Sequence, residues 1–376
     1  HQLVGQNSPY ASDRVRNCSA NRPTDTAWDS SGNVYVLEYG NNRIKVFDSA
    51  GTYLRSFGSY GYGCNQWRHA RQFTIYNDEI YLADTYSQRV LKLGLNGQCI
   101  RVGATLFSYP HAIAVNSNYV FVGTPGSQFE ALNRSGLSQA GYQYLSSGDL
   151  NYAWGMALNG AGNKLVIGNY YNSKVIEYNV SGSRISVARK PNTLFGSSNG
   201  QFRYAVDAGY DSSGNIYGLD LNNHRIQKFN SSLAYQAKTG SYSTSSGFRY
   251  PYGMHIDSSD NIYVTDFYNY AVRKYNTSLS ETATYGGGGG TLLDAAKKVI
   301  KKIVSNTDLT SGANFGFMQW ASSNRIRVRI SDTGAKSIFT DVDNVSAGGG
   351  TNLLSAMNTA RNYFTTGQVA NWNKTC

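Results

Sequence analysis

The chain has 376 residues, of which 40% are hydrophobic and only 15% are charged, and it is rich in Gly (40) and Tyr (30). Because it contains no run of about 18 apolar residues, the sequence excludes a membrane-spanning helix. The net charge of +11 is spread thinly, without the dense basic run typical of nucleic-acid-binding proteins, so we expect an extracellular or cell-surface protein that is attracted to anionic surfaces and has no nucleic-acid partner.

A unit of strands and turns repeats along most of the chain. Its clearest copy is Asp29–Phe57, which begins with an Asp-Ser-Ser-Gly-Asn turn. Such turns favour tight hairpins, because Asp and Asn bond their own backbone and Gly accepts positive φ. Six copies, about 40 to 50 residues apart, begin near Thr24, Ala70, His111, Trp154, Val206 and Gly253. Four short strands per copy predict a mainly β fold, a six-bladed β-propeller over residues 1–285.

The repeat also resembles a known family. The segments GNVYVLEYGNNRIKVFDSAG and GNIYGLDLNNHRIQKFNSS are similar to NHL repeats, and the resemblance covers roughly Thr24 to Gly286. It implies the propeller fold. Its implication for function is open, because such propellers serve as binding platforms, scaffolds and occasional enzymes.

The outer strands do not match the inner ones in number. Residues 1–6 read as an outer strand, which gives seven outer strands for six inner sets. In one interpretation the N-terminal strand closes the last blade and Glu281–Tyr285 leaves as a linker. In the other, a surplus strand pairs with another molecule and builds a polymer.

The C-terminal part changes its pattern. A flexible linker is predicted at Gly286–Gly290, which are all glycines. Residues 291–376 then show an amphipathic helical period, strands at Asn314–Ala321 and Arg325–Ile330, and a further helix after Thr351, which predicts a small α/β module.

This module resembles part of a von Willebrand factor A domain, of the type found in PilY-like type IV pilus tip adhesins. The resemblance rests on LLDAAKKVIKKIV, ANFGFMQWASSNRIRVRISD and GGGTNLLSAMNTARNYF. In that family a metal is held by an Asp-x-Ser-x-Ser loop, a Thr and a later Asp. Thr351 matches the Thr, but the other ligands are absent, and one neutral hydroxyl cannot hold a divalent cation. We therefore expect no occupied metal site and no cofactor.

Disulfides are expected from the cysteines. Four cysteines without metal-ligand spacing, in an extracellular context, allow three disulfide connectivities. They are Cys18, Cys64, Cys99 and Cys376.

The sequence contains little that indicates a catalytic site. His111 enters an inner strand much as metal-binding histidines do in peptidylamidoglycolate lyase propellers, but no further histidine occupies the matching positions, so a structural role is favoured. Carboxylates recur at equivalent positions of the repeat, which suggests hydrogen bonding in turns rather than an acid/base pair. They are Asp25 with Asp207, and Asp84 with Asp220 and Asp266.

Paired tyrosines and an arginine stripe are the candidate binding surface. Tyrosine gives a large rigid contact area at low entropic cost, although core packing explains some of these residues equally well. The candidates are Tyr60, Tyr62, Tyr170, Tyr171, Tyr268 and Tyr270, together with Arg325, Arg327 and Arg329 on an expected edge strand.

Together these features predict a non-enzymatic adhesion protein that is associated with type IV pili. Its partners would be other proteins, components of the cell surface or matrix, or further copies joined through terminal strands. The alternatives are a subunit of an extracellular filament held by strand or loop exchange, and an NHL-type propeller lyase.

Overall fold

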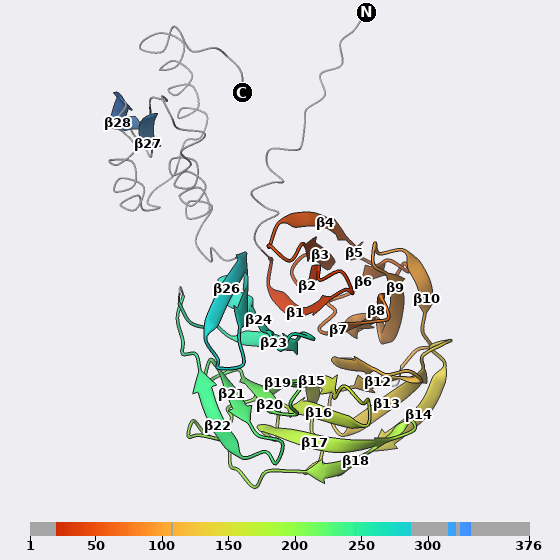
Figure 1. Cartoon of the computed structure of the whole chain (residues 1–376). Helices are drawn as coiled ribbons and strands as arrows, with labels where there is room; N and C mark the ends of the chain where they lie inside the picture. The colour runs from red at the N-terminus through yellow and green to blue at the C-terminus, as the bar shows by residue number, and fades with distance from the viewer. Residues whose placement is uncertain (1–19, 107, 245, 287–314, 321–323, 332–376) are drawn as a thin grey trace, which may run out of the picture. The chain divides into compact units, whose positions relative to one another are not determined.

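A computed structural model describes residues 20–106, 108–244 and 246–286, and two strands at 315–320 and 324–331. The chain divides into two compact units, His1–Gly289 and Gly290–Cys376. In the first unit six four-stranded antiparallel sheets are arranged around a common centre (Figure 1). The six-bladed propeller expected from the repeat is therefore confirmed.

Each blade takes four strands in chain order, from the centre outward. The first two blades contain β1 (Pro23–Trp28), β2 (Val34–Glu38), β3 (Arg43–Phe47) and β4 (Tyr53–Phe57), then β7 (Phe73–Tyr76), β8 (Glu79–Asp84), β9 (Arg89–Gly94) and β10 (Cys99–Val102). The third and fourth contain β11 (Ala112–Val115), β12 (Tyr119–Gly123), β13 (Gln128–Asn133) and β14 (Gln139–Tyr144), then β15 (Ala153–Leu158), β16 (Lys164–Asn169), β17 (Lys174–Ser181) and β18 (Arg184–Arg189). The last two contain β19 (Ala205–Tyr210), β20 (Ile216–Asp220), β21 (Arg225–Phe229) and β22 (Tyr235–Thr239), then β23 (Pro251–Ile256), β24 (Ile262–Asp266), β25 (Ala271–Tyr275) and β26 (Glu281–Gly286).

Short elements lie in the loops. The strands β5 (Ser59–Tyr60) and β6 (Gln66–Trp67) pair in parallel between the first two blades, and the single-turn 3₁₀ helices η1 (Thr85–Ser87) and η2 (Phe267–Asn269) follow β8 and β24. In the described part of the chain no helix is long and apolar enough to cross a bilayer.

The repeated turn forms for the reason expected from its sequence. Asp29 Oδ1 accepts hydrogen bonds from the backbone N–H groups of Ser31 and Asn33, at 3.0 and 2.9 Å, and Gly32 has a φ of 80°. The hydroxyl of Tyr35 on β2 donates to Asp29 Oδ2 at 3.1 Å. The turn is therefore tied to the strand that follows it, and Asp211 and Tyr217 repeat the arrangement in the fifth blade.

The core lies between the blades. Six clusters of buried side chains occupy the six interfaces of neighbouring blades, including the interface of the last blade with the first. At that seam the ring of Trp28 meets the rings of His255 and Tyr263, with centroids 4.5 and 5.5 Å apart, and Thr265 Oγ1 donates to the carbonyl of Thr24 at 3.2 Å. Packing across the seam thus closes the ring.

One interpretation of the strand count is wrong. Glu281–Tyr285 does not leave the ring as a linker, because β26 pairs with β25 from Ala271 to Tyr275 as the outer strand of the sixth blade. Residues 1–6 lie outside the described residues, so exchange of that segment between molecules stays a prediction.

In the second unit, β27 (Phe315–Trp320) and β28 (Asn324–Ser331) pair antiparallel, which agrees with the two strands expected there. The arginines of the predicted stripe occupy alternate positions of β28. The expected helices, Thr351, Cys18 and Cys376 lie outside the described residues. The linker and the rest of the α/β module therefore stay predictions.

Candidate functional site

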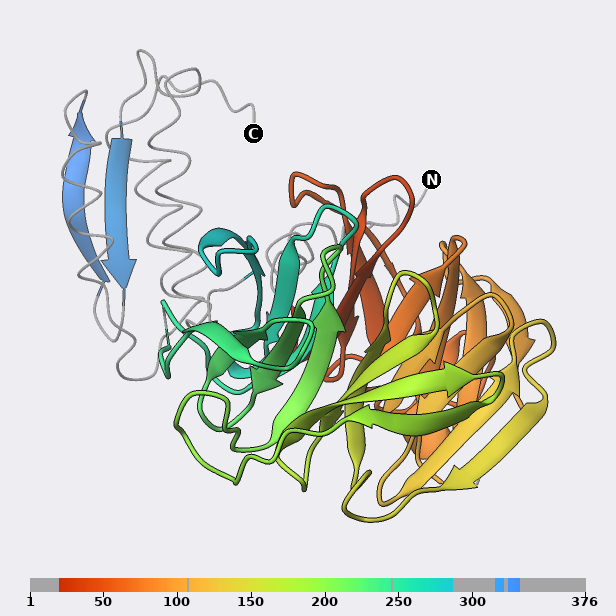
Figure 2. The same cartoon turned by 60° about the horizontal axis from the view of Figure 1, so that its bottom comes forward.

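The topology of the blades separates two kinds of loop. Because each blade is an antiparallel meander, the loop between its second and third strands and the loop that leads to the next inner strand lie at one end of the ring. The hairpin between the first and second strands and the hairpin between the third and fourth strands lie at the other end. Figure 2 shows the ring turned by 60°, with loops at both ends of the strands.

We call the first end the aromatic face and the second the turn face. The described loops of the aromatic face are 20–22, 39–42, 58–72, 85–88, 103–106, 108–111, 124–127, 145–152, 170–173, 190–204, 221–224, 240–244, 246–250 and 267–270. The turns of the turn face are 29–33, 48–52, 77–78, 95–98, 116–118, 134–138, 159–163, 182–183, 211–215, 230–234, 257–261 and 276–280. Within these described ranges the turn face contains no Tyr, Trp or Phe.

The two faces also differ in charge. The loops of the aromatic face contain six basic side chains and one acidic one, a balance of +5, from Arg22, Arg68, Arg71, Lys190, Arg203, Arg249 and Asp149. The turns of the turn face contain one basic and six acidic side chains, a balance of −5, from Arg134, Asp29, Asp48, Asp78, Asp211, Asp257 and Asp260. The propeller therefore has a basic aromatic end and an acidic end.

The predicted tyrosines all belong to loops of the aromatic face. The most exposed are Tyr62 and Tyr171, whose side chains are 66% and 61% exposed, and Tyr60 is also exposed. Tyr170, Tyr268 and Tyr270 are half-buried, and the rings of Tyr170 and Tyr268 pack against other aromatic rings of the face. The predicted arginine stripe belongs to the second unit and is not part of this face.

Aromatic rings form a ladder near the centre of the aromatic face. Tyr152 stacks on Trp154 with centroids 5.4 Å apart, Trp154 on Tyr170 at 4.8 Å, and Tyr170 on Tyr204 at 4.5 Å, with interplanar angles of 28°, 19° and 16°. These four residues are the ring ladder. The two inner rings, Trp154 and Tyr170, are stacked between neighbours, so their edges and the phenol hydroxyl of Tyr170 are the parts left for a ligand.

A pocket opens at the axis beside the ring ladder. The pocket is narrow, with a cavity volume of about 10 Å³ that is enough for about one water molecule, and the wider empty space of about 220 Å³ includes open solvent at its mouth. Residues at the inner ends of five blades line this axial pocket, namely Thr24, Asp25, Arg71, Gln72, Trp154, Gly155, Asp207, Tyr252 and Gly253.

Arg71 is the cation of the axial pocket. Its guanidinium carbon lies 4.7 Å from the ring centroid of Trp154 and 5.4 Å from that of Tyr39. Burial raises the pKa of Tyr252, and the charge of Arg71 and its hydrogen bond to the phenol oppose that rise. Among the described residues Arg71 forms no salt bridge, and its buried Nε has no hydrogen-bond partner.

The two aspartates of the pocket are structural. Asp25 accepts hydrogen bonds from the N–H groups of Thr26 and Phe73, at 2.8 and 2.9 Å, and so connects the first blade to the second. Asp207 binds the fifth blade to the sixth in the same way. Burial raises the pKa of Asp207 to about 7, and burial together with the charge of Asp207 raises the pKa of Asp25. The interpretation of this pair as turn residues is wrong, because each carboxylate bonds to a neighbouring blade.

The other recurring carboxylates do stabilise loops. Asp84, Asp220 and Asp266 each accept a hydrogen bond, at 2.7 or 2.8 Å, from a backbone N–H in the loop that precedes their blade's inner strand. Each also forms a salt bridge at 2.8 or 2.9 Å with an arginine on the next strand, Arg89, Arg225 or Arg273. These pairs anchor the loops of the aromatic face.

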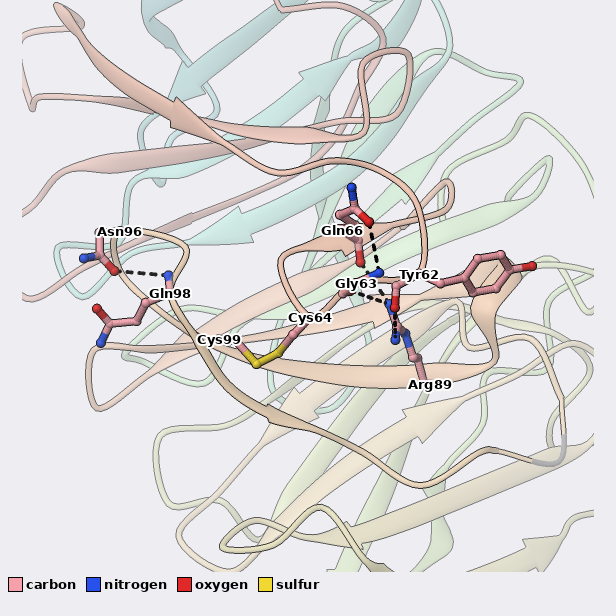
Figure 3. Close-up of a disulfide and its surroundings, with 8 residues drawn as sticks. All are labelled: Tyr62, Gly63, Cys64, Gln66, Arg89, Asn96, Gln98 and Cys99. Atoms are coloured by element: carbon pink, nitrogen blue, oxygen red, sulfur yellow. Dashed lines mark hydrogen bonds between the residues drawn. A yellow bond between two sulfur atoms is a disulfide. The ribbon is translucent and has the colours of Figure 1, made fainter.

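A disulfide fixes the loop that bears Tyr60 and Tyr62. Cys64 of this loop is bonded to Cys99 at the start of β10, with Cα atoms 5.4 Å apart (Figure 3). Arg89 donates to the carbonyls of Tyr62, Gly63 and Gln66 at 2.8 to 3.0 Å. Of the pairings left open by the sequence, the structure shows Cys64–Cys99, and Cys18 and Cys376 lie outside the described residues.

His111 is buried at the edge of the ring ladder. Its Nε2 lies 3.2 Å from the hydroxyl of Tyr152, and its Nδ1 has no partner. Burial, assisted by the charge of Arg71, lowers the pKa of His111 to about 3, so its imidazole is neutral. The described residues contain no group of three or more His, Cys, Asp or Glu side chains placed to hold a metal ion.

Sequence reasoning missed Arg71, Trp154 and Tyr252 as members of one site. Each lies just before, or at the start of, the inner strand of a different blade. This shared position in the repeat is the only sequence signal that could have predicted that they belong to one site.

Comparisons with known proteins support the fold. None of the curated proteins matches the chain. The structure is similar to a solved one described as "Streptogramin B lyase structure", with a TM-score of 0.53 and 13% identity over 73% of this chain and 86% of that chain. At this identity the similarity shows the fold alone, which many functions share. Residues 21–47 match the NHL repeat family, so the first blade contains an NHL repeat and the chain has the propeller fold that its sequence predicts.

Proposed function

We propose that this protein is an extracellular or cell-surface adhesion protein that binds its partners through the aromatic face of the propeller. The observation that supports this proposal is the gathering of tyrosines and arginines at one end of the ring. Tyrosine and arginine are enriched in binding interfaces and often contribute most of the binding energy. The salt bridges and the disulfide described above hold the loops of this face in place, which limits the entropy lost on binding.

The proposal is tested with tyrosine variants of the purified protein. Tyr62→Ser and Tyr171→Ser remove two of the most exposed rings of the aromatic face, and we expect the double variant to bind cells or extracellular matrix at least about tenfold more weakly. Leu54→Ser is the control, because Leu54 is 45% exposed near the start of the outer strand β4, toward the turn face. Equal binding by the double variant and the control would contradict the proposal.

The association with type IV pili rests on the resemblance of residues 291–376 to PilY-like adhesins. Co-purification of the full chain with pili, and its loss after removal of residues 291–376, tests this part of the proposal. An unchanged yield of the truncated protein with the pili would count against it.

A filament subunit is the second candidate. The opposite charges of the two faces favour stacking of one copy's aromatic face on the turn face of the next, a heterologous contact that builds an open chain. Negative-stain images should then show fibres at low ionic strength that disperse in high salt. Single particles under both conditions would remove this candidate.

A lyase is the third candidate, and the hydrogen bond between His111 and Tyr152 favours it. A neutral imidazole in hydrogen-bond contact with a phenol can serve as an acid/base pair. Turnover of streptogramin B by the purified protein, with loss of activity in Tyr152→Phe, is the expected result for a lyase. No turnover by the folded protein would argue against it.

A further inference from the structure

We propose that Arg71, at the mouth of the axial pocket, binds a carboxylate or sulfate group of an acidic polysaccharide. The inference rests on the proposed function, because it names the class of ligand that the aromatic face would bind. It also makes a separate claim about one residue.

The first argument is the state of Arg71. Its guanidinium lies at a pocket mouth, half-buried between the rings of Trp154 and Tyr39, and the described residues provide no carboxylate within salt-bridge distance. Cation–π contacts orient the group, but they leave N–H donors in the plane of the guanidinium. A planar carboxylate or a sulfate matches such a fork of donors.

The second argument is the charge of the surroundings. The loops of the aromatic face have a balance of +5, so an anionic polymer is attracted to this end of the ring and repelled from the turn face. Two carboxylates, Asp25 and Asp207, also line the pocket, and their burial favours the neutral, protonated form. Asp25 and Asp207 are each 1% exposed and each accept two backbone N–H groups, and burial raises the pKa of both.

The third argument concerns the kind of polymer. Single-stranded nucleic acids bind through bases that stack on open aromatic faces, but the two inner rings of the ring ladder, Trp154 and Tyr170, are each stacked between two neighbours. Ring edges carry partial positive charge, and phenol hydroxyls both donate and accept hydrogen bonds. Those groups suit the hydroxyls and acidic oxygens of a sugar.

The pocket also contains a polar atom without a partner. Thr24 lines the pocket and is 3% exposed, and its Oγ1 has no hydrogen-bond partner. Beside the ring ladder, buried His111 has the same property at Nδ1. Buried polar groups are normally satisfied, so an unpartnered hydroxyl at the pocket is consistent with a polar ligand.

The test is calorimetric titration of the full chain with polygalacturonate, heparin and neutral dextran. We expect both acidic polymers to bind and dextran not to bind. Arg71→Gln should lower the affinity for both acidic polymers about tenfold or more, because a hydrogen bond to a charged group is lost. Arg101→Gln removes the same charge from the exposed outer strand β10 and should change the affinity less than about twofold.

A second measurement uses the unmodified protein and does not depend on the folding of a variant. Polygalacturonate should protect Arg71 from modification by phenylglyoxal, as read by peptide mass spectrometry, whereas dextran should not, and Arg101 should react equally with both present. An unprotected Arg71 overturns the proposal.

Other results also decide against it. Equal affinity of Arg71→Gln and Arg101→Gln overturns the role of Arg71, and equally tight binding of a uridine oligonucleotide that also requires Arg71 overturns the polysaccharide class. The adhesion proposal fails separately, when loss of Tyr62 and Tyr171 leaves cell binding unchanged although the polysaccharide still binds at Arg71.

Discussion

The carboxylate of Asp207 on β19 accepts a hydrogen bond of 2.8 Å from the backbone N–H of Met254 on β23, so a side chain of the fifth blade holds the inner strand of the sixth. The fit is close. A Cβ atom added at Gly155 would lie 2.4 Å from Asp207 Oδ1, and one added at Gly168 would lie 2.5 Å from its backbone nitrogen. The glycines of the fourth blade thus admit a carboxylate that connects the two blades after it.

The pH dependence of stability should reflect Asp207. Its pKa is raised by burial from an ordinary value of 3.8 to about 7, so between these pH values the folded protein keeps a proton that the unfolded chain has released. The free energy of unfolding contributed by this group therefore falls as pH rises through that window. Urea unfolding between pH 4 and 8 should show a smaller slope in Asp207→Asn. An identical slope would contradict this assignment.

The seam between the first and last blades should not tolerate a side chain at Gly253. A Cβ atom there would lie 2.1 Å from the carbonyl oxygen of Thr24. Gly253→Ala should lower the free energy of unfolding by about 1–3 kcal/mol, because packed backbones must separate. Gly160→Ala is the control, since nothing lies within 4 Å of its added Cβ. Equal melting temperatures for the two variants would show that the seam adjusts at little cost.

The disulfide should stabilise the ring. Cys64 and Cys99 are 35 residues apart in the sequence, and a cross-link of this length typically contributes about 2–4 kcal/mol. Replacing both with Ser should lower the melting temperature of the propeller and increase proteolysis of the 58–72 loop. The same melting temperature with and without the cross-link would contradict this expectation.

The buried pair of Arg225 and Asp220 should be costly to break. Arg225 is 4% exposed, pairs with Asp220 at 2.9 Å and donates to the carbonyls of Ser197, Ser198 and Gln201. Arg225→Ala leaves a buried carboxylate without its cation, so unfolding should become easier by about 3–5 kcal/mol. The double variant Arg225→Ala with Asp220→Asn should lose less free energy of unfolding than the two single variants lose together. A double-mutant cycle measured by urea unfolding would show this difference. Strict additivity would mean that the two side chains act independently.

Much of the fold could be predicted from local chemistry. The turn at Asp29 and its later copies encode hairpins, and their spacing encodes blades, so the number of blades and the order of strands within a blade followed from the sequence. The role of Glu281–Tyr285 did not, because strand propensity shows that a segment is extended but not which neighbour it pairs with. The place of β26 depends on pairing with β25.

The candidate site divides in the same way. The sequence by itself determined that tyrosines recur in the loops, that three of the four cysteines fall within the predicted propeller, and that equivalent carboxylates repeat. Only the tertiary structure decided that these tyrosines lie on one face, and that Arg71, Trp154 and Tyr252 surround one pocket. The physical reason is closure of the ring. The order of antiparallel strands in each blade fixes the end of the ring at which a loop lies. Only the packing of six blades around an axis brings together side chains that are about 80 to 180 residues apart in the chain.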